Sequence, residues 1–455
     1  MKTRMNFKDE FYQKLKLLVL PIAIQNFMLA LVSATDAIML GWIDQTSLSA
    51  VSLAGQVQFV LSLFISGIAA GAGIMAAQYW GKQDAASIEK VIPIALRTNL
   101  LFSGLFTILA GFCPEMLMRI FTNDAALVAS GSQYLRAVAL SYVLCGISQV
   151  YLILLKNTGH AAVSSRISST AVVLNIILNA ILIYGLCGAP ALGIRGAAYA
   201  TVAARVVELI WAYLETKKPE RVRILWNRLF SSAGKILSED FWRYTLPVLA
   251  ASLVWGIAYV LYSVIMGHMG SDAVAANSIT SIVKSLLSCL IRGVSGGAGV
   301  LIGNLLGANE LEKAREYGGR LSHLSIAIGI VTGGLLMLIS PAIVHFAPLS
   351  DTAAEYLQYM LLFCGLNLMA QSVNTTVLDG IFCAGGDAKF DMQGNIGAMW
   401  CFSVPLGFLA AFWLKLPVMV VYCIVNLDEI VKLPAVYHHY KKYIWVRNIT
   451  RDVED

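Results

Sequence analysis

Charged side chains are scarce in this sequence. Only 13% of its 455 residues are charged and 58% are hydrophobic, whereas about a quarter of the residues in an ordinary soluble domain are charged. A soluble chain of this length needs a polar surface around its core, and this composition does not supply one. The shortage of charge excludes an ordinary soluble protein and indicates that lipid covers most of the outer surface.

Motifs for metal binding, disulfide formation and nucleotide hydrolysis are also missing. The 8 cysteines are scattered singly without a Cys-x-x-Cys pair, and the 6 histidines lie mostly at the ends of apolar stretches. We expect neither a metal site nor a disulfide framework nor a cofactor from this pattern. No phosphate-binding loop is present, so ATP is not the expected energy source. An enzyme inside the membrane would need a cluster of acids, histidines or metal ligands in its apolar stretches, so we expect no enzyme activity.

About twelve apolar runs, each near or above the roughly 20 residues of a membrane-spanning helix, divide the sequence. They lie at approximately 17–40, 48–79, 91–113, 132–156, 164–186, 192–216, 241–266, 274–306, 318–346, 352–382, 392–412 and 416–438. The predicted fold is therefore an all-α polytopic membrane protein with twelve transmembrane helices.

The basic residues set the expected orientation in the membrane. With the N-terminus inside the cell, about 26 of the 33 Lys and Arg residues fall in the two tails and the even-numbered loops. This asymmetry predicts a multi-pass protein of the inner or plasma membrane with both termini in the cytoplasm. Since the basic residues cluster between apolar runs, the net charge of +6 does not indicate a nucleic-acid partner.

The second half of the sequence repeats the first at an offset of 226 residues. Leu20-Pro21 falls on Leu246-Pro247, and Gly71-Ala72-Gly73 falls on Gly297-Ala298-Gly299. Shared apolar composition does not explain why glycines and prolines recur at equivalent positions of the two halves. Each half holds six runs, so both halves enter the membrane from the same side and form a parallel repeat.

The repeat predicts two lobes. An N-terminal six-helix lobe covers 1–216, a cytoplasmic linker covers 217–240, and a C-terminal six-helix lobe with a cytoplasmic tail covers 241–455. Two such lobes enclose a cavity that rocking exposes to each side in turn. The glycines of 293–303 follow no strand, so we expect them to allow close helix packing and not to bind a dinucleotide.

Short motifs along nearly the whole chain resemble the multidrug and toxic compound extrusion (MATE) family. The matching segments are Leu20-Pro21, Thr35 to Gly41, Gly81 to Asp84, Asn175 to Asn179, Ile183 to Gly185, Gly193 to Thr201 and Ala384 to Asp387. Each match is short, but their order and spacing are fairly specific.

The resemblance implies a secondary antiporter that exports organic cations, drugs or amphipathic metabolites in exchange for H⁺ or Na⁺. The alternative is a flippase of a lipid-linked precursor in the same superfamily; twelve spans with few buried charges favour the antiporter. The expected partners are a small amphipathic substrate and the lipid bilayer. We expect a monomer, because two lobes in one chain already complete a cavity.

Asp36 is the leading candidate for cation coupling. It follows an apolar run and has no basic residue nearby in its own helix. A carboxylate in hydrocarbon costs several kcal/mol, so acids inside a membrane usually face a cavity and serve a function; a solvated position at the outer interface is the alternative. A carboxyl that takes up a cation on one side and releases it on the other is what ion coupling requires.

Asn175, Asn179 and Thr201 are expected to join Asp36. The two asparagines are spaced i, i+4 and share a helix face, and Thr201 lies at a comparable depth in the next span. Their oxygens suit either a hydrogen-bonded proton or a small hard cation, whereas joining helices to each other is the alternative role. Asn179 stands where the family often has an acid, and Pro247 to Met266 holds no acid where many members have one. The first lobe is therefore the expected coupling site.

Six further residues are candidates. Pro21 matches the family's bend in the first helix, although a proline near a helix start is also tolerated. Gln56, Gln149, Lys284, Arg292 and Asp379 are expected to line a cavity. The two buried cations, Lys284 and Arg292, would repel cationic cargo, bind anionic cargo or balance Asp379; reaching the cytoplasmic side is the alternative.

Overall fold

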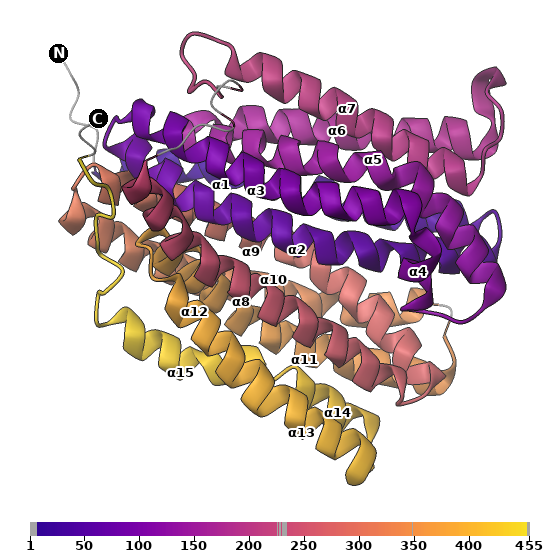
Figure 1. The fold of residues 1–455 in the computed structure, drawn as a ribbon. Coiled ribbons are helices and arrows are strands. Elements are labelled where there is room, and N and C mark those ends of the chain that lie inside the picture. The colour runs from indigo at the N-terminus through magenta and orange to yellow at the C-terminus, as the bar shows by residue number, and fades with distance from the viewer. Residues whose placement is uncertain (1–6, 225, 227–228, 230–233, 348, 453–455) are drawn as a thin grey trace. The chain divides into compact units, whose positions relative to one another are not determined.

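The computed structural model describes residues 7–452 except 225, 227–228, 230–233 and 348, and consists of long helices (Figure 1). The first half contains α1 (Phe7–Gly41), α2 (Gln45–Gly81), α3 (Ala85–Phe112), α4 (Pro114–Arg119), α5 (Ala125–Leu155), α6 (Ala161–Tyr184) and α7 (Ile194–Thr216). The second contains α8 (Lys235–Gly267), α9 (Ser271–Gly307), α10 (Leu311–Phe346), α11 (Asp351–Thr375), α12 (Ala388–Asn395), α13 (Val404–Phe408), α14 (Val418–Val425) and α15 (Asp428–Tyr440). The π-helical segments η4 (Thr376–Phe382), η5 (Ile396–Ser403) and η6 (Leu409–Trp413) extend or join α11, α12 and α13.

Helix length and hydropathy agree with a membrane-spanning chain. Within the described ranges, 10 helical stretches are long and apolar enough to cross a membrane. One of them, Ala125–Tyr184, is 60 residues long and contains both α5 and α6, which Gly159 separates with a backbone φ of 81°. The predicted span at 416–438 is formed by α14 and α15, which are interrupted at Asn426. The structure thus confirms the all-α polytopic fold.

The sequence repeat is also a repeat of helices. α2 begins at Gln45 and α9 at Ser271, α3 begins at Ala85 and α10 at Leu311, and α5 begins at Ala125 and α11 at Asp351. Each pair keeps the offset of 226 residues. The turns after α2 and α9 also match, because Gln83 has a φ of 64° and its counterpart Asn309 a φ of 61°.

The chain forms two compact units that do not coincide with the predicted lobes. The N-unit comprises Phe27–Leu249 and Arg451–Asp455, and the C-unit comprises Met1–Asn26 and Ala250–Thr450. The first part of α1 therefore packs with the second half of the sequence, and the first part of α8 packs with the first half. The prediction did not anticipate this exchange, because a repeat in the sequence does not show which helices are neighbours.

Glycines at equivalent positions of the repeat explain how each exchanged segment is held. In the N-unit, a Cβ built on Gly67 would lie 2.9 Å from Leu249 Cα, and one on Gly71 would lie 2.7 Å from Thr245 Cα. In the C-unit, a Cβ on Gly293 would lie 2.9 Å from Ala23 Cα, and one on Gly297 would lie 2.8 Å from Val19 Cγ2. Such distances are too short for any other residue, so glycine is what allows these helices to approach. Close packing at Gly293 and Gly297 was predicted and is confirmed.

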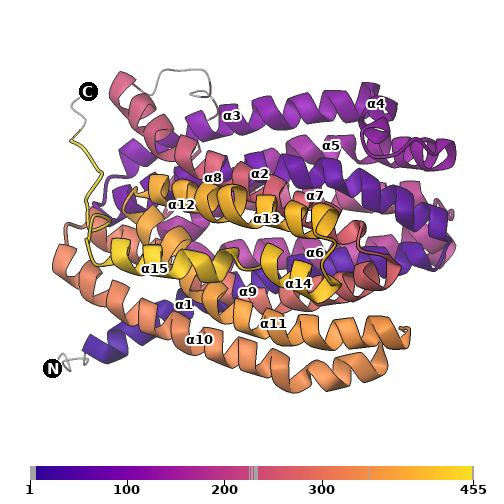
Figure 2. The same ribbon diagram turned by 90° about the horizontal axis from the view of Figure 1, so that it is seen from below.

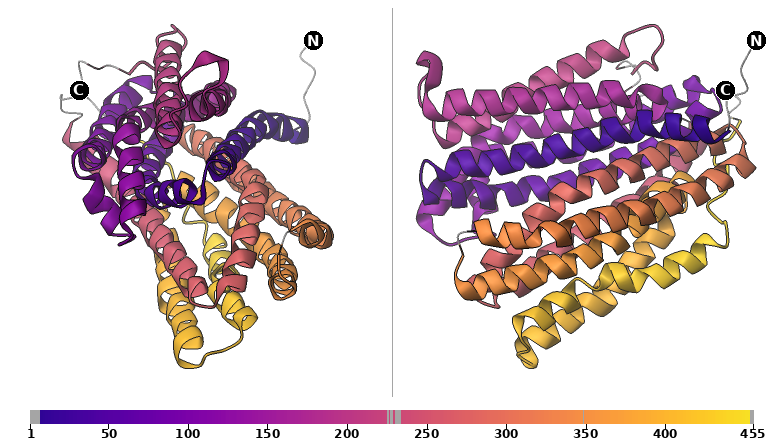
Figure 3. Two further views of the ribbon diagram at one scale, coloured as in Figure 1. Left: turned by 90° about the vertical axis from the view of Figure 1, so that its right-hand side faces the viewer. Right: turned by 180° about the vertical axis from the view of Figure 1, so that it is seen from behind.

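Each unit has its own helix bundle, which the end-on view shows (Figure 3, left). In the N-unit, α5 packs against α2, α3 and α7, and α6 packs against α7. In the C-unit, α11 packs against α9 and α10, and α14 and α15 lie end to end beside α12 and α13 (Figure 2). These contacts place the polar residues of α6, α7, α11 and α15 inside the bundles.

Candidate functional site

Asp36 lies in the last third of α1 and faces α6. Its carboxylate Oδ1 accepts a hydrogen bond of 2.5 Å from Asn179 Nδ2. Asn179 is completely buried and Asp36 is half-buried. Three residues further along α1, the Met39 carbonyl accepts a hydrogen bond of 2.7 Å from the Tyr184 hydroxyl. These two bonds attach α6 to the end of α1 that carries the acid.

A chain of hydrogen bonds continues from Asp36 to α7. Asn179 Nδ2 also donates to Asn175 Oδ1 at 3.2 Å, as the i, i+4 spacing predicts. Asn175 Nδ2 donates to Thr201 Oγ1 at 3.3 Å. The structure therefore brings the four predicted residues together, whereas their binding of a cation stays a prediction.

The turn between α6 and α7 sets the register of Thr201 against Asn175. The Leu192 amide donates to the Leu182 carbonyl at 2.9 Å. Gly196 packs so closely against the same carbonyl that a Cβ would collide with it. This close approach keeps the start of α7 against the end of α6 and explains why position 196 is a glycine.

One polar atom of this group has no protein partner. Asn179 Oδ1 is buried and makes no hydrogen bond among the described residues, and an unsatisfied buried acceptor costs about 1–3 kcal/mol. The Asp36 carboxylate has no ion pair within 4.0 Å in the described ranges. A negative charge, an unpaired amide oxygen and a threonine hydroxyl together form a set of oxygen ligands that a proton or a small hard cation can complete.

The other candidate residues lie elsewhere. Pro21 is inside α1, well beyond the helix start at Phe7, so the alternative of a proline near the start is wrong. Gln56 is exposed on α2 and Gln149 is half-buried on α5. In the described part of the chain, neither glutamine hydrogen-bonds to the group around Asp36.

The candidates in the C-unit are not paired with each other. Lys284 is half-buried on α9 and its Nζ donates to Asn367 Oδ1 at 3.0 Å. Arg292 is exposed on α9, and Asp379 is exposed in η4. Within the described ranges neither cation lies within 4.0 Å of Asp379, so a direct ion pair, one of the roles considered for the two cations, is not seen.

A buried ion pair of the N-unit was missed by the sequence analysis. Arg205 Nη1 contacts both Glu208 carboxylate oxygens, at 3.0 and 2.9 Å. Ser148 Oγ donates to the same carboxylate at 2.6 Å. The i, i+3 spacing of opposite charges inside an apolar span was the available signal. Because the two charges neutralise each other, the pair is better explained as a structural contact between α5 and α7 than as a site that exchanges a coupling ion.

A larger charged group of the C-unit, here called the α15 cluster, was also missed. It consists of Asp391, Asp428, Glu429 and Lys432, with Asn374 and Asn395. Lys432 Nζ lies 3.0 Å from Glu429 and 3.7 Å from Asp428, and donates to Asn395 Oδ1 at 3.2 Å. Asn395 Nδ2 donates to Asp391 at 3.1 Å, and Asn374 Nδ2 donates to Glu429 at 2.8 Å. Three charges spaced i, i+1, i+4 in the last predicted span were the signal.

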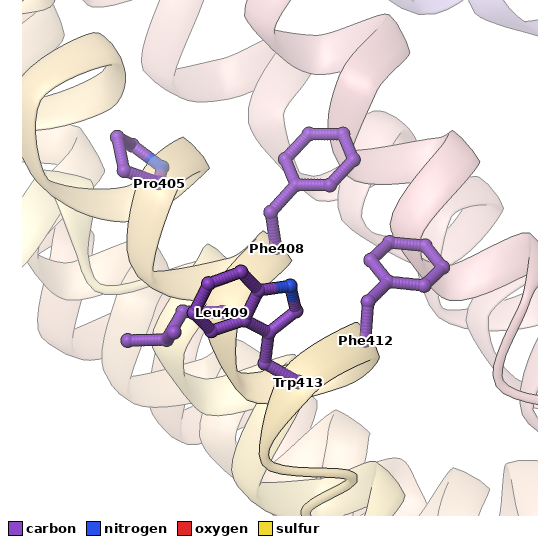
Figure 4. Close-up of a pocket in the computed structure, with 5 residues that line it drawn as sticks. All are labelled: Pro405, Phe408, Leu409, Phe412 and Trp413. Carbon is purple, nitrogen blue, oxygen red and sulfur yellow. The ribbon is translucent and has the colours of Figure 1, made fainter.

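An apolar depression on α13 and η6 has no such chemistry. Pro405, Phe408, Leu409, Phe412 and Trp413 line it (Figure 4), and Phe408 and Phe412 stack with ring centroids 5.5 Å apart. Its exposed aromatic rings fit contact with lipid, because amphipathic and aromatic side chains favour the membrane boundary.

Comparisons with known proteins agree with the fold. The family model MatE matches residues 21–181 and 247–409. The uncharacterized transporter YisQ of Bacillus subtilis (strain 168) is 21% identical over 427 residues, which cover 94% of this chain and 93% of YisQ. The probable multidrug resistance protein NorM of Thermotoga maritima is 24% identical over 415 residues, which cover 90% of this chain and 87% of NorM.

Solved structures show the same fold. A MOP superfamily transporter from Pyrococcus furiosus superposes with a TM-score of 0.86 at 19% identity, covering 95% of this chain and 96% of that one. A structure described as MATE in the bent conformation gives a TM-score of 0.84 at 19% identity, with coverage of 95% for both chains. The chain belongs to the MatE family of multidrug efflux transporters, with twelve helices in two lobes. It is a transporter, not an enzyme.

Proposed function

We propose that this transporter exports organic cations, drugs or other small amphipathic molecules in exchange for H⁺ or Na⁺, with Asp36 binding the coupling ion. The observation that supports this most directly is the isolation of the Asp36 charge. Its one hydrogen bond in the described part of the chain comes from a neutral amide. Binding of one cation would neutralise the carboxylate, and alternating exposure of Asp36 to the two sides would then couple the ion gradient to export.

The chemistry of the group fits both ions. A proton would convert the carboxylate into a hydrogen-bond donor. Asn179 Oδ1, which has no partner, would accept that bond after rotation of its amide; amide orientations are assigned from the hydrogen-bond network. Na⁺ prefers oxygen ligands as other hard cations do, and Asp36, Asn179 and Thr201 offer them. We further propose that both termini lie in the cytoplasm, because the Lys and Arg residues concentrate in those loops and tails.

The test uses purified protein in liposomes and a fluorescent organic cation such as ethidium. A pH gradient without Na⁺, and then a Na⁺ gradient at equal pH, separates the two coupling ions. We expect the wild type to move dye under one gradient and Asp36→Asn to match protein-free liposomes. Transport by Asp36→Asn at the wild-type rate would contradict the proposed role of Asp36. No dye movement by the wild type would favour a narrower cargo, or the flippase alternative.

Asp44 offers a matched control. It is an exposed acid at the end of the turn after α1, where it caps α2 by accepting bonds of 2.7 and 2.6 Å from the Ser47 amide and hydroxyl. The hydrogen bonds from Ser47 lower the pKa of the Asp44 carboxyl below its usual value, so Asp44 stays charged at neutral pH. Asn also caps helices well. We therefore expect Asp44→Asn to keep transport within about twofold of wild type.

A further inference from the structure

A small polar cavity lies inside the C-unit, apart from the group around Asp36. Residues of α8, α9 and α14 and the turn after α14 surround a cavity of about 40 Å³, which is room for one small polar group. Its polar lining includes Tyr262, Asn277, Thr280, Ser281, Lys284 and Asn426. The proposed function assigns no role to this cavity.

The sequence places the polar residues of α9 on one face. Asn277, Ser281 and Lys284 follow each other at spacings of four and three residues, which are the spacings of one helix face. In the described part of the chain, the side chains of Asn277 and Ser281 make no hydrogen bond within the protein, whereas Thr280 Oγ1 donates to its own helix at 2.9 Å. An amide and a hydroxyl are therefore available to a molecule in the cavity.

Lys284 supplies a positive charge that a hydrogen bond holds in place but that forms no ion pair among the described residues. Its ammonium has three donors, and in the described ranges it makes a single hydrogen bond, to Asn367 Oδ1 at 3.0 Å. Asn367 is itself fixed, because its Nδ2 donates to the Asn426 carbonyl at 2.6 Å. The ammonium thus keeps spare donors in a defined place at the cavity wall.

The acids that lie near Lys284 in the fold already have partners of their own. Asp428 and Glu429 of the neighbouring α15 lie 3.7 and 3.0 Å from Lys432, and Glu429 also accepts from Asn374 at 2.8 Å. No carboxylate of the described residues lies within 4.0 Å of Lys284 Nζ. Lys284 therefore makes no ion pair with the α15 cluster, although its charge interacts with the carboxylates of Asp428 and Glu429 at longer range.

Tyr262 adds a buried hydroxyl to the cavity wall. Its side chain is 8% exposed and lines the same cavity, and the Ser403 hydroxyl lies next to its oxygen and can donate to it. With Ser403 donating to its oxygen, the Tyr262 hydroxyl keeps its own proton for a ligand group that accepts hydrogen bonds.

We infer that this cavity binds the carboxylate of a transported amphipathic molecule, with Lys284 and Tyr262 as its donors and Asn367 as the residue that positions Lys284. A carboxylate accepts several charge-assisted hydrogen bonds at once, which matches an ammonium, a phenol and a free amide around one small space. The inference rests on the proposed export of amphipathic molecules and extends their class to zwitterions and anions.

The experiment measures equilibrium binding without any ion gradient. A rhodamine with a free carboxylate and the ethyl ester of the same dye are titrated into purified protein, and fluorescence anisotropy reports binding. We expect Lys284→Met to weaken binding of the carboxylate dye by about tenfold and to leave binding of the ester within about twofold. Lys284→Arg should keep most of the preference, and Tyr262→Phe should weaken the carboxylate dye by less than Lys284→Met.

Arg292→Met is the matched control, because Arg292 lies on the same helix, carries the same charge and does not line the cavity. It should leave both dyes unchanged. The inference is overturned if the wild type does not prefer the carboxylate dye, if Lys284→Met changes both dyes alike, or if Arg292→Met has the same effect as Lys284→Met. Unchanged ester binding shows that each variant is folded.

Asp36→Asn separates this inference from the proposed function. It should abolish gradient-driven transport and leave binding of the carboxylate dye unchanged, because the cavity is formed by residues of α8, α9 and α14. If the wild type moves no dye in liposomes but still binds the carboxylate dye through Lys284, the proposed function fails and the binding site stands.

Discussion

The group around Asp36 in the N-unit and the α15 cluster in the C-unit both contain carboxylates, but these carboxylates have different partners. Asp36 of the N-unit has one neutral amide as its partner at 2.5 Å. In the C-unit, Asp391, Asp428 and Glu429 share a resident ammonium, that of Lys432, directly or through Asn395. An acid without a resident cation is free to exchange one, whereas acids around a fixed lysine hold helices together. The same residue type therefore has different consequences at these two places, and Glu208 of the N-unit, which is paired with Arg205, resembles the acids of the α15 cluster.

This comparison predicts opposite phenotypes for two substitutions. Lys432→Met leaves three carboxylates buried without their cation, and breaking a buried pair costs about 3–5 kcal/mol of unfolding free energy. Asp36→Asn removes an isolated charge and should change stability by less than about 1 kcal/mol while it abolishes transport. Thermal unfolding in detergent measures both. A Lys432→Met protein as stable as wild type would show that Lys432 does not neutralise the α15 cluster.

Restoring the charge balance should recover part of the loss. Glu429→Gln in the Lys432→Met background removes one unpaired carboxylate next to the vacated position. Because directly contacting residues have interaction free energies of about 0.5–3 kcal/mol, we expect the double variant to be more stable than Lys432→Met by up to about 3 kcal/mol. The measurement is a double-mutant cycle of unfolding temperatures. Additive effects would mean that the 3.0 Å contact between Lys432 and Glu429 carries no stabilising free energy.

Asn179→Ala should impair ion coupling more than folding. It removes the amide donor to Asp36 and the unpaired oxygen, and hydrogen bonds to charged groups contribute about 1.5–3 kcal/mol. If the ion is Na⁺, we expect the Na⁺ concentration for half-maximal transport to rise about tenfold or more. If the ion is H⁺, the pH of half-maximal transport should rise, because the lost bond stabilised the ionised carboxylate. Asn99→Ala is the control, since its buried amide donates to the Gly146 carbonyl at 3.3 Å; it should leave ion dependence unchanged.

Thr201→Val should have the smallest effect in this series. The bond from Asn175 Nδ2 to Thr201 Oγ1 is 3.3 Å long and joins two neutral groups, and such bonds contribute about 0.5–1.5 kcal/mol. We expect the ion dependence of transport to shift by about two- to tenfold. A complete loss of coupling in Thr201→Val would show that the hydroxyl is a direct ligand of the ion and not only a partner of Asn175.

Much of the architecture could be predicted before the structure. Membrane spans are long apolar helices because every backbone polar group in lipid must form its hydrogen bond within the helix. The number and order of the spans can therefore be read from each stretch of sequence by itself. Asp36 could be recognised because a lone acid in such a run is rare. Asn175 and Asn179 could be paired because their spacing is that of one helix face.

The α15 cluster and the cavity beside Lys284 could not be assembled in the same way. Lys432 and Asn395 lie on different helices and meet at 3.2 Å only because α15 packs beside α12 and η5. The sequence showed that Lys284 lies inside a span, but it did not show whether an acid, an asparagine or a cavity would face its ammonium.

The sequence alone determined the class of the protein, its helices and its repeat, and it predicted Asp36 as the acid for ion coupling, because hydropathy, glycine register and helix spacing are local properties. The tertiary structure alone decided that the first parts of α1 and α8 pack with the opposite halves of the chain. It also decided which buried charges are neutralised. Both depend on side-by-side contacts between helices distant in sequence, and in lipid those contacts are set by close packing at small residues such as Gly71 and Gly293 and not by hydrophobicity.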